Sequence, residues 1–164
     1  MTSKRAHELL TYDCESGKVF WRVSPCNATK AGDEAGRIVG AYRVAKVDYK
    51  SYPVHHLVWL LVYGVFPRYN IDHIDGNGLN NKVENLRDVP RCINQRNRKQ
   101  AKNNTSGITG VHWDKVYKRW VAKVKINGES RFLGGYTSKE DAGIAREKYL
   151  EEHKELGFTT RHGK

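Results

Sequence analysis

The residues best suited to chemistry in this sequence are an aspartate and a histidine that are adjacent, Asp72 and His73. They stand in the run Ile71-Asp72-His73-Ile74, and the turn-forming run 75–78 follows directly. A carboxylate is a hard ligand that suits Mg²⁺ or Mn²⁺. An imidazole can take a proton from water near neutral pH. The pair therefore indicates metal-assisted hydrolysis.

Asparagines are concentrated in the segment that follows this pair. Asparagine is a mediocre helix former and favours turns and hydrogen bonds to the nearby backbone. The concentration therefore indicates side chains that fix a loop, bind an ion or contact a polar partner. An amide oxygen is also a hard metal ligand. The asparagines are Asn77, Asn80, Asn81, Asn85, Asn94 and Asn97.

Elements that must position these residues are predicted on both sides of them. The run 53–59 is typical of a buried element, and 57–65 predicts an apolar helix that Pro67 ends. Beyond the turn, the pattern predicts a helical segment from Lys82, interrupted by Pro90, and a second helix over 91–100.

Together, these motifs resemble those of the HNH homing-type endonucleases common in phages. The resemblance implies the ββα-metal fold, in which two short strands, a loop and a helix hold one divalent ion. It also implies a metal-dependent hydrolysis of DNA phosphodiester bonds that leaves a 5′-phosphate and a 3′-hydroxyl. The motifs that carry it are residues 54–58, 71–77, 80–81 and 83–87, and Asn94.

The resemblance also implies a role for each residue that matches the motif. Asp72 and Asn94 would be the metal ligands, with Mg²⁺ expected and Mn²⁺ able to substitute. His73 would be the general base that activates water. Asn85, twelve residues after His73, would brace the loop that carries it. Many relatives end the motif in a second histidine, and Asn94 stands at that position here. The metal ligand on the helix would therefore be an amide.

Cationic side chains near the pair have two interpretations each. In the family a histidine commonly stands at the position of His55 and approaches a phosphate, but a histidine inside an apolar run is also typical of a core. Arg87, Arg91 and Arg98 belong to a basic run over 87–102, which is usually a solvated face or a tether. Beside a nuclease site, we predict that they bind the DNA backbone.

The overall charge is consistent with a nucleic-acid partner. The 164 residues carry a formal net charge of +11, which favours a polyanion, although a basic ribosomal-type protein has the same balance. Three cysteines are widely separated and form no C-x-x-C motif, so we expect neither a structural zinc nor a disulfide framework. The sequence predicts no membrane span and no signal peptide, and hence a location in the cytoplasm, the host cytoplasm if a phage encodes it.

Residues 1–53 read as a lead-in to the nuclease motif. A short helix is predicted over 4–10, and strands over 17–23, 37–40 and 42–48. We expect these strands to extend the nuclease sheet. The pattern of Tyr12-Asp13, Gly17 and Trp21 resembles what precedes the motif in many phage relatives.

A different pattern begins after a polar, turn-rich linker. Strands are predicted over 110–113, 119–126 and 129–136, with Asn127-Gly128 as a tight hairpin turn, and then a helix from a capping box at 137–141 to about Leu156. This order resembles the APETALA/ethylene-response-factor type of DNA-binding domain, carried by Trp113, Trp120, Ala122 and the residues around them. The resemblance implies that the sheet enters the major groove.

Five side chains are the candidates for DNA contact in this second region. The alternative is that cations on an exposed strand only provide solubility. We favour DNA contact because the chain is basic and the region follows a nuclease motif. The candidates are His112, Arg119, Lys123, Lys125 and Arg131.

These inferences give one overall prediction. The fold class is α+β: a ββα-metal core with an N-terminal β extension, and a small three-stranded antiparallel sheet packed on one helix. The predicted parts are a nuclease domain over 1–97 with its core motif at 54–97, a basic linker at 98–106, an APETALA-type domain at 107–158 and a tail at 159–164. The function is DNA endonuclease acting on double-stranded DNA as a monomer or weak dimer. The alternative is a decayed nuclease that only binds DNA.

Overall fold

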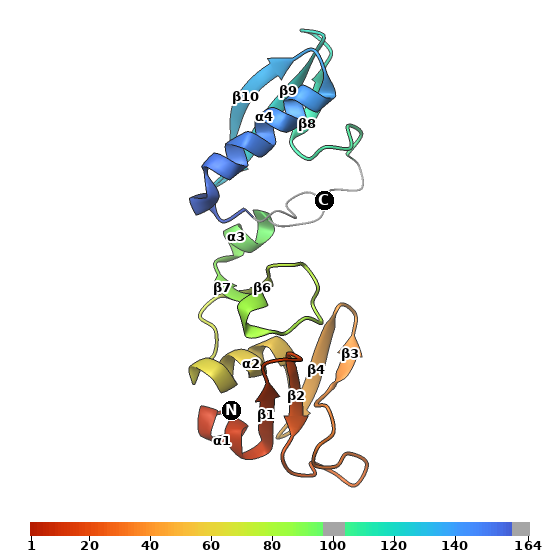
Figure 1. Cartoon of the computed structure of the whole chain (residues 1–164), viewed down its shortest axis with the longest axis vertical. Helices are drawn as coiled ribbons and strands as arrows, with labels where there is room; N and C mark the ends of the chain where they lie inside the picture. Colours follow the sequence, from red (N-terminus) through yellow and green to blue (C-terminus); the bar gives the residue numbers. More distant parts are fainter. Residues whose placement is uncertain (97–103, 159–164) are drawn as a thin grey trace. The chain divides into compact units, whose positions relative to one another are not determined.

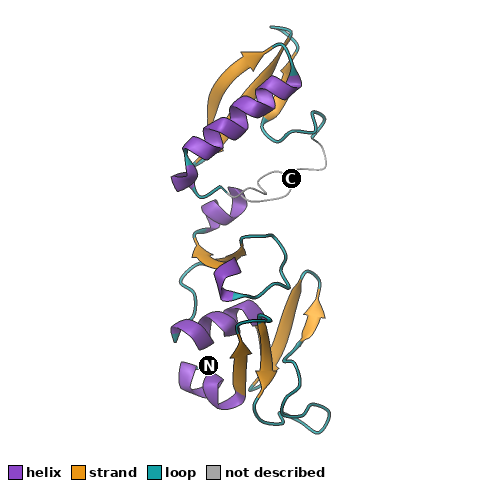
Figure 2. Cartoon of the chain, viewed as in Figure 1, coloured by secondary structure: helices purple, strands orange, loops and turns teal. Residues whose placement is uncertain are grey.

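The computed structural model describes residues 1–96 and 104–158, and it divides into two compact units, Met1–Pro90 and Arg91–Lys164. Both units combine small antiparallel sheets with short helices (Figures 1 and 2). The predicted α+β fold class is confirmed. Among the described residues, no helix has both the length and the apolar character needed to cross a membrane.

The first unit begins with the lead-in that the sequence predicts. Helix α1 (Ser3–Leu9) is capped by Thr2, whose side chain accepts a hydrogen bond from the backbone of Arg5. A hairpin of β1 (Leu10–Asp13) and β2 (Lys18–Trp21) follows. A separate three-stranded sheet then forms in the order β3 (Arg37–Val39), β4 (Tyr42–Val47) and β5 (Lys50–Pro53). The predicted helix and strands of the lead-in are confirmed, and β5 was not predicted. The expectation that these strands extend the nuclease sheet is wrong, because β1–β2 and β3–β4–β5 form sheets separate from β6–β7.

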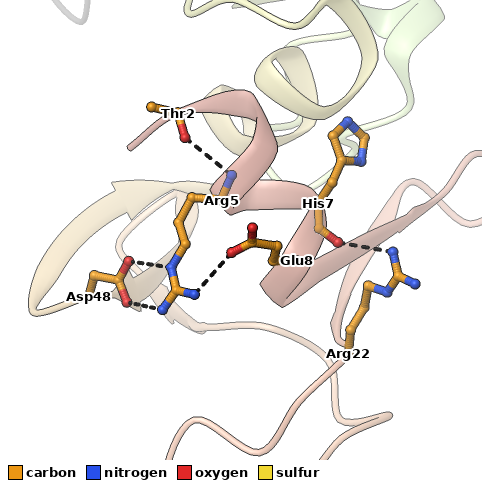
Figure 3. A network of polar contacts seen from close by, with 6 residues as sticks. All are labelled: Thr2, Arg5, His7, Glu8, Arg22 and Asp48. Carbon is orange, nitrogen blue, oxygen red and sulfur yellow. Dashed lines mark hydrogen bonds and ion pairs between the residues drawn. The ribbon is translucent and has the colours of Figure 1, made fainter.

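Exposed polar contacts join the parts of this lead-in (Figure 3). Arg5 donates from Nε and Nη2 to the two carboxylate oxygens of Asp48 at 3.0 and 3.2 Å, and from Nη1 to Glu8 at 3.1 Å. Arg22 donates to the backbone oxygen of His7 at 2.9 Å. These bonds connect α1 with the β4–β5 turn and with the end of β2.

Helix α2 (Val54–Tyr63) is the centre of the core of the first unit. It packs against β1, β2, β4 and β5, and five of its apolar side chains are buried. The helix starts three residues earlier than predicted. It ends at Gly64, whose φ of 77° is left-handed and closes the last turn, so Pro67 does not end it. The buried apolar residues of α2 are Val54, Leu57, Val58, Leu60 and Leu61.

The segment after α2 forms a second small hairpin. Strand β6 (Asn70–His73) pairs with β7 (Leu86–Val89), so that Asp72 lies opposite Arg87 and His73 opposite Leu86. The helix predicted from Lys82 is wrong: only the 3₁₀ turn η1 (Val83–Asn85) precedes β7. Pairing with a strand more than ten residues away overrides the local preference, because it buries Leu86 beside Ile71 in the core.

The second unit holds a three-stranded sheet covered by one long helix. After α3 (Arg91–Arg96), the sheet has the order β10 (Glu129–Tyr136), β9 (Arg119–Ile126), β8 (Val111–Asp114). Helix α4 (Lys139–Glu152) is capped by Ser138 and is followed by the 3₁₀ turn η2 (Lys154–Leu156). Figure 1 shows α4 lying along the sheet. The buried residues of the small core between them are Val111, Ala122 and Ala142. The predicted strands and the start of the helix are confirmed, but the helix ends at Glu152, before the predicted end near Leu156. Most of the predicted linker and the tail lie outside the described residues.

Candidate active site

Strand β6 carries Asp72 and His73 as its last two residues, and both side chains are buried, at 4% and 5% exposed. Asp72 forms an ion pair with its cross-strand partner Arg87. Two guanidinium nitrogens, Nε and Nη2, donate to Asp72 Oδ2 at 3.0 and 2.7 Å. Two of the guanidinium nitrogens of Arg87 are thus bonded to Asp72, and its contact with the DNA backbone stays a prediction.

His73 is held by contacts on its ring and on its backbone. Its Nε2 lies 3.0 Å from Oδ1 of the buried Asn81. The backbone oxygen of His73 accepts a hydrogen bond from Gly76, and the next residue, Ile74, donates to the backbone oxygen of Asn85. Both the side chain and the peptide group of His73 are therefore oriented by the loop that joins β6 to β7.

Asn85 is the residue that closes this loop. Its side-chain oxygen accepts from the backbone of Asp75 at 3.0 Å, and its Nδ2 donates to Asp75 Oδ1 at 2.9 Å and to the backbone oxygen of Asn80 at 2.8 Å. Asn80 in turn donates to Asp75 Oδ2 at 2.7 Å. Burial alone would raise the pKa of Asp75, but these amides and the backbone N–H of Asn77 outweigh burial and lower that pKa. These contacts of Asn85 hold the ends of the loop together, and its role as a brace for His73 stays a prediction.

Aromatic side chains cover the other side of His73. The rings of His55 and His73 meet edge to face, with centroids 5.1 Å apart, and the Tyr42 ring lies 5.4 Å from His55 and 5.9 Å from His73. His55 is 8% exposed, and its Nδ1 has no hydrogen-bond partner. Burial, and then the neighbouring His56 and His73, lower the pKa of His55 to about 3. A buried neutral imidazole is poorly suited to a phosphate, so of the two interpretations of His55 the core position fits.

The remaining candidates of this region lie in or after α3, in the second unit. Asn94 is half-buried and Arg91 is exposed on α3. Arg98 lies outside the described residues. The described part of the chain contains no group of three or more His, Cys, Asp or Glu side chains arranged to hold a metal. The expected donor set is of another kind, one carboxylate and one amide.

Three residues near His73 were not predicted as part of the site. Asn81 contacts the imidazole, Tyr42 packs beside it, and the hydroxyl of Tyr12 hydrogen-bonds to the backbone on both sides of Lys82. Asn81 belongs to the asparagine-rich segment, so its residue type already indicated a side chain that fixes a loop or contacts a polar group. Tyr12 and Tyr42 come from strands far away in the sequence, and no local pattern connects them to His73.

Comparison with known proteins identifies this region. A model of the HNH endonuclease family matches residues 52–96. Over 85 residues the chain is 42% identical to Protein 3.8 of Escherichia phage T7, a match that covers 51% of this chain and 70% of that protein. The chain belongs to the protein 3.8 family and contains an HNH endonuclease domain. No solved structure gives a significant match. These matches do not bear on the APETALA-type resemblance of 107–158, which stays a prediction.

The HNH match includes the whole β6–β7 hairpin and α2. It therefore places Asp72, His73, Asn81 and Asn85 in a domain whose relatives are nucleases. HNH nucleases in general use divalent metal ions.

Cationic side chains, some of them half-buried, line the face of the second unit's sheet opposite α4. Arg119, Lys123 and Lys125 occupy alternate positions of β9, and His112 is exposed on β8. We call these four residues the basic face. Arg131 is placed differently: it pairs with Val124, and its guanidinium donates to the Tyr149 hydroxyl of α4 at 3.1 Å. Arg131 therefore lies on the helix side of the sheet, apart from the basic face.

Arg119 is the most constrained cation of the basic face. Its side chain lies across Gly135, where an added Cβ would sit 2.5 Å from Arg119 Cδ. The guanidinium carbon lies 5.0 Å from the Tyr117 ring centroid and 5.9 Å from that of Phe132. Both distances are within the range of a cation–π interaction, about 6 Å. Packing against two exposed rings holds the guanidinium of Arg119 on the surface of the sheet.

Proposed function

We propose that this protein is a metal-dependent endonuclease that hydrolyses phosphodiester bonds in double-stranded DNA. The observation that carries the proposal is the end of β6 in an HNH domain: a buried carboxylate, Asp72, is followed directly by a buried imidazole, His73, whose ring and backbone are both fixed. Such preorganisation is what a general base requires, because its position relative to the reacting water decides its efficiency.

In this proposal His73 accepts a proton from a water molecule as the water oxygen bonds to phosphorus. The bond between phosphorus and the 3′ oxygen breaks in line with the attack, and the departing 3′ oxygen takes a proton from solvent. The products are a 5′-phosphate and a 3′-hydroxyl. Asn85 acts by holding the loop that follows His73 through its bonds to Asp75 and Asn80. It is a positioning residue.

The residue types proposed as ligands, a carboxylate and an amide, suit a divalent ion. Asp72 and Asn94 would hold it, and a carboxylate with an amide oxygen is a combination that Mg²⁺ accepts while it keeps several water ligands, with Mn²⁺ as a substitute. The bound ion would supply positive charge to the phosphate and to the departing 3′ oxygen. Arg87 forms an ion pair with Asp72 and orients its carboxylate at the end of β6.

We further propose that the basic face of the second unit binds the DNA backbone and contributes affinity. Alternate cations on one strand, with exposed aromatic rings beside Arg119, suit contacts to phosphates and sugars. Arg131 is left out of this interface because it bonds to α4. Arg91 stays a candidate because it is exposed.

A plasmid cleavage assay tests the activity. Purified protein is incubated with supercoiled plasmid DNA and Mg²⁺ or Mn²⁺, with EDTA in parallel, and with an RNA of similar length as a second substrate. The expected result is nicked or linear plasmid with either ion, intact plasmid with EDTA, and ends that carry 5′-phosphate. Plasmid binding without any cleavage, whichever divalent ion is present, would instead identify a decayed nuclease that only binds DNA.

A further inference from the structure

The proposed roles do not use the polar contact between the side chains of Asn81 and His73. Both side chains are buried, at 3% and 5% exposed, and Asn81 Oδ1 lies 3.0 Å from His73 Nε2. An amide oxygen can only accept a hydrogen bond, so Nε2 must be the donor. A neutral imidazole carries one N–H, and the lone pair must then be on Nδ1.

We infer that Asn81 is a positioning residue that selects the tautomer of His73 in which Nε2 is protonated and Nδ1 is the basic nitrogen. This inference rests on the proposed function, because only a general base needs one particular nitrogen to be basic. It adds the atom that takes the proton from water, Nδ1, and the residue that makes this atom available.

The lead-in hairpin holds Asn81 in place. The hydroxyl of Tyr12 on β1 donates to the backbone oxygen of Asn81 at 3.3 Å and accepts from the backbone of Val83 at 2.9 Å. Gly17, at the β1–β2 turn, approaches the same segment so closely that an added Cβ would lie 2.7 Å from the backbone nitrogen of Lys82. The backbone on both sides of Lys82 is therefore fixed by a hairpin about seventy residues earlier in the chain.

A second surface keeps the imidazole from rotating away from Asn81. His55 meets the His73 ring edge to face, and Tyr42 packs beside both rings. Gly78 lets the loop approach Tyr42, because a Cβ there would lie 2.7 Å from the tyrosine ring. The ring of His73 is thus bounded by an acceptor on one edge and by aromatic side chains on another.

Nitrogen NMR of the full-length protein tests the inference without any metal or activity. In protein labelled at histidine nitrogens, above neutral pH, a protonated nitrogen and a nitrogen with a lone pair have well-separated chemical shifts. Wild type is expected to show His73 protonated at Nε2, and Asn81→Leu, which keeps the volume but lacks the acceptor, is expected to show mixed tautomers. Protonation of His73 at Nδ1 in wild type, or an unchanged tautomer in Asn81→Leu, would overturn the inference.

Kinetics provide the second measurement. Asn81→Leu is expected to lower kcat about 10²-fold with KM unchanged, because the misplaced lone pair affects only proton transfer. Asn81→Asp should restore most of kcat, since a carboxylate oxygen accepts the same hydrogen bond and favours the same tautomer. Exposed Asn27 supplies the control Asn27→Leu, which should behave as wild type. Equal kcat in Asn81→Leu and wild type would contradict the inference.

The two measurements separate the inference from the proposed function. If wild type cuts no DNA but shows His73 protonated at Nε2 with the tautomer lost in Asn81→Leu, the proposed function fails and the positioning by Asn81 stands. If wild type cuts DNA and Asn81→Leu does so equally well with the same tautomer, the proposed function stands and the inference fails.

Discussion

The two units of this protein differ in how many polar side chains they bury and in the size of the core beside them. In the described part of the first unit, five polar side chains are buried around the β6–β7 hairpin, beside a core of fourteen buried apolar residues. In the described part of the second unit the buried core cluster has three residues, and Ser106 and Arg146 are the buried polar side chains. On the basic face, His112 and Lys125 are exposed, while Arg119 and Lys123 are half-buried. The buried polar residues of the first unit are His55, Asp72, His73, Asn81 and Asn85.

This difference agrees with the two proposed tasks, which are to hold a catalytic site in the first unit and to bind DNA in the second. Burying a polar group is unfavourable unless it is hydrogen-bonded, so a fixed set of buried polar groups requires a large apolar core to offset it. A surface that binds a polyanion has no such need, because its cations must remain accessible. We therefore expect substitutions in the first unit to change the rate or stability, and substitutions on the basic face to change affinity.

The largest effect is expected at His73. His73→Ala removes the proposed base and should lower kcat about 10²–10⁴-fold while DNA affinity stays as in wild type. Plasmid cleavage and electrophoretic mobility shift, measured on the same preparations, check both halves of this expectation. Exposed His7 offers a control, since His7→Ala changes a histidine of the same unit away from the hairpin. Equal cleavage by His73→Ala and wild type would remove His73 from the mechanism.

The basic face should give the opposite result. Replacing Arg119, Lys123 and Lys125 together with Ala should weaken DNA binding about tenfold or more, and should lower the slope of log K against log salt by up to about 3, roughly one for each phosphate contact. Cleavage at saturating DNA should not change. The control replaces Lys139, Lys148 and Lys154, which lie on α4 or just after it. If both triple variants lose affinity equally, binding follows net charge and the basic face has no special role.

His55 should make the first unit sensitive to acid. Its pKa of about 3 lies below the ordinary value of about 6.5, so below pH 6.5 the unfolded chain binds a proton that the folded chain does not. Stability is therefore expected to fall as pH decreases from about 6.5 towards 3. His55→Phe keeps an aromatic ring but cannot bind this proton. Between pH 7 and pH 4, its free energy of unfolding should therefore fall by about 1–3 kcal/mol less than that of wild type. Hydrogen-exchange protection of the α2 amides measures this difference, and parallel pH dependence in the two proteins would contradict it.

A smaller effect on stability is expected at Tyr12. Tyr12→Phe leaves the Val83 N–H and the Asn81 C=O without the hydroxyl that bonds to both, which should cost about 1–3 kcal/mol. The free energy of local unfolding, from hydrogen exchange at 81–86, measures the loss. Tyr49 is 94% exposed, and Tyr49→Phe is the matched control. No loss relative to this control would mean that the lead-in hairpin does not support the loop.

Local chemistry explains which parts of the fold could be predicted. Strands β9 and β10 have the predicted bounds, because Asn127-Gly128 fixes a tight turn between two alternating segments. The cap of α4 at Ser138 is likewise a local pattern. The segment after Lys82 was mispredicted as helix because its partner, β6, lies outside any local window.

The candidate site divides in the same way. The adjacent Asp72 and His73, and the spacing of Asn85, could be found in the sequence because they depend on residue type and order. The partners of Arg87 and Arg131 could not, and both cations prove to be bonded to other residues of their own units. A free arginine and a paired one look the same in a sequence.

By itself the sequence determined that a carboxylate and an imidazole stand together before an asparagine-rich loop, and that a hairpin and a helix follow later in the chain. Only the tertiary structure decided that Asn81 meets Nε2 of His73, that Tyr12 supports Asn81, and that His55 is buried. The physical reason is the distance along the chain over which the interactions act. Turns and caps depend on interactions within a few residues, whereas the surroundings of His73 depend on strands brought together by burial of a shared core.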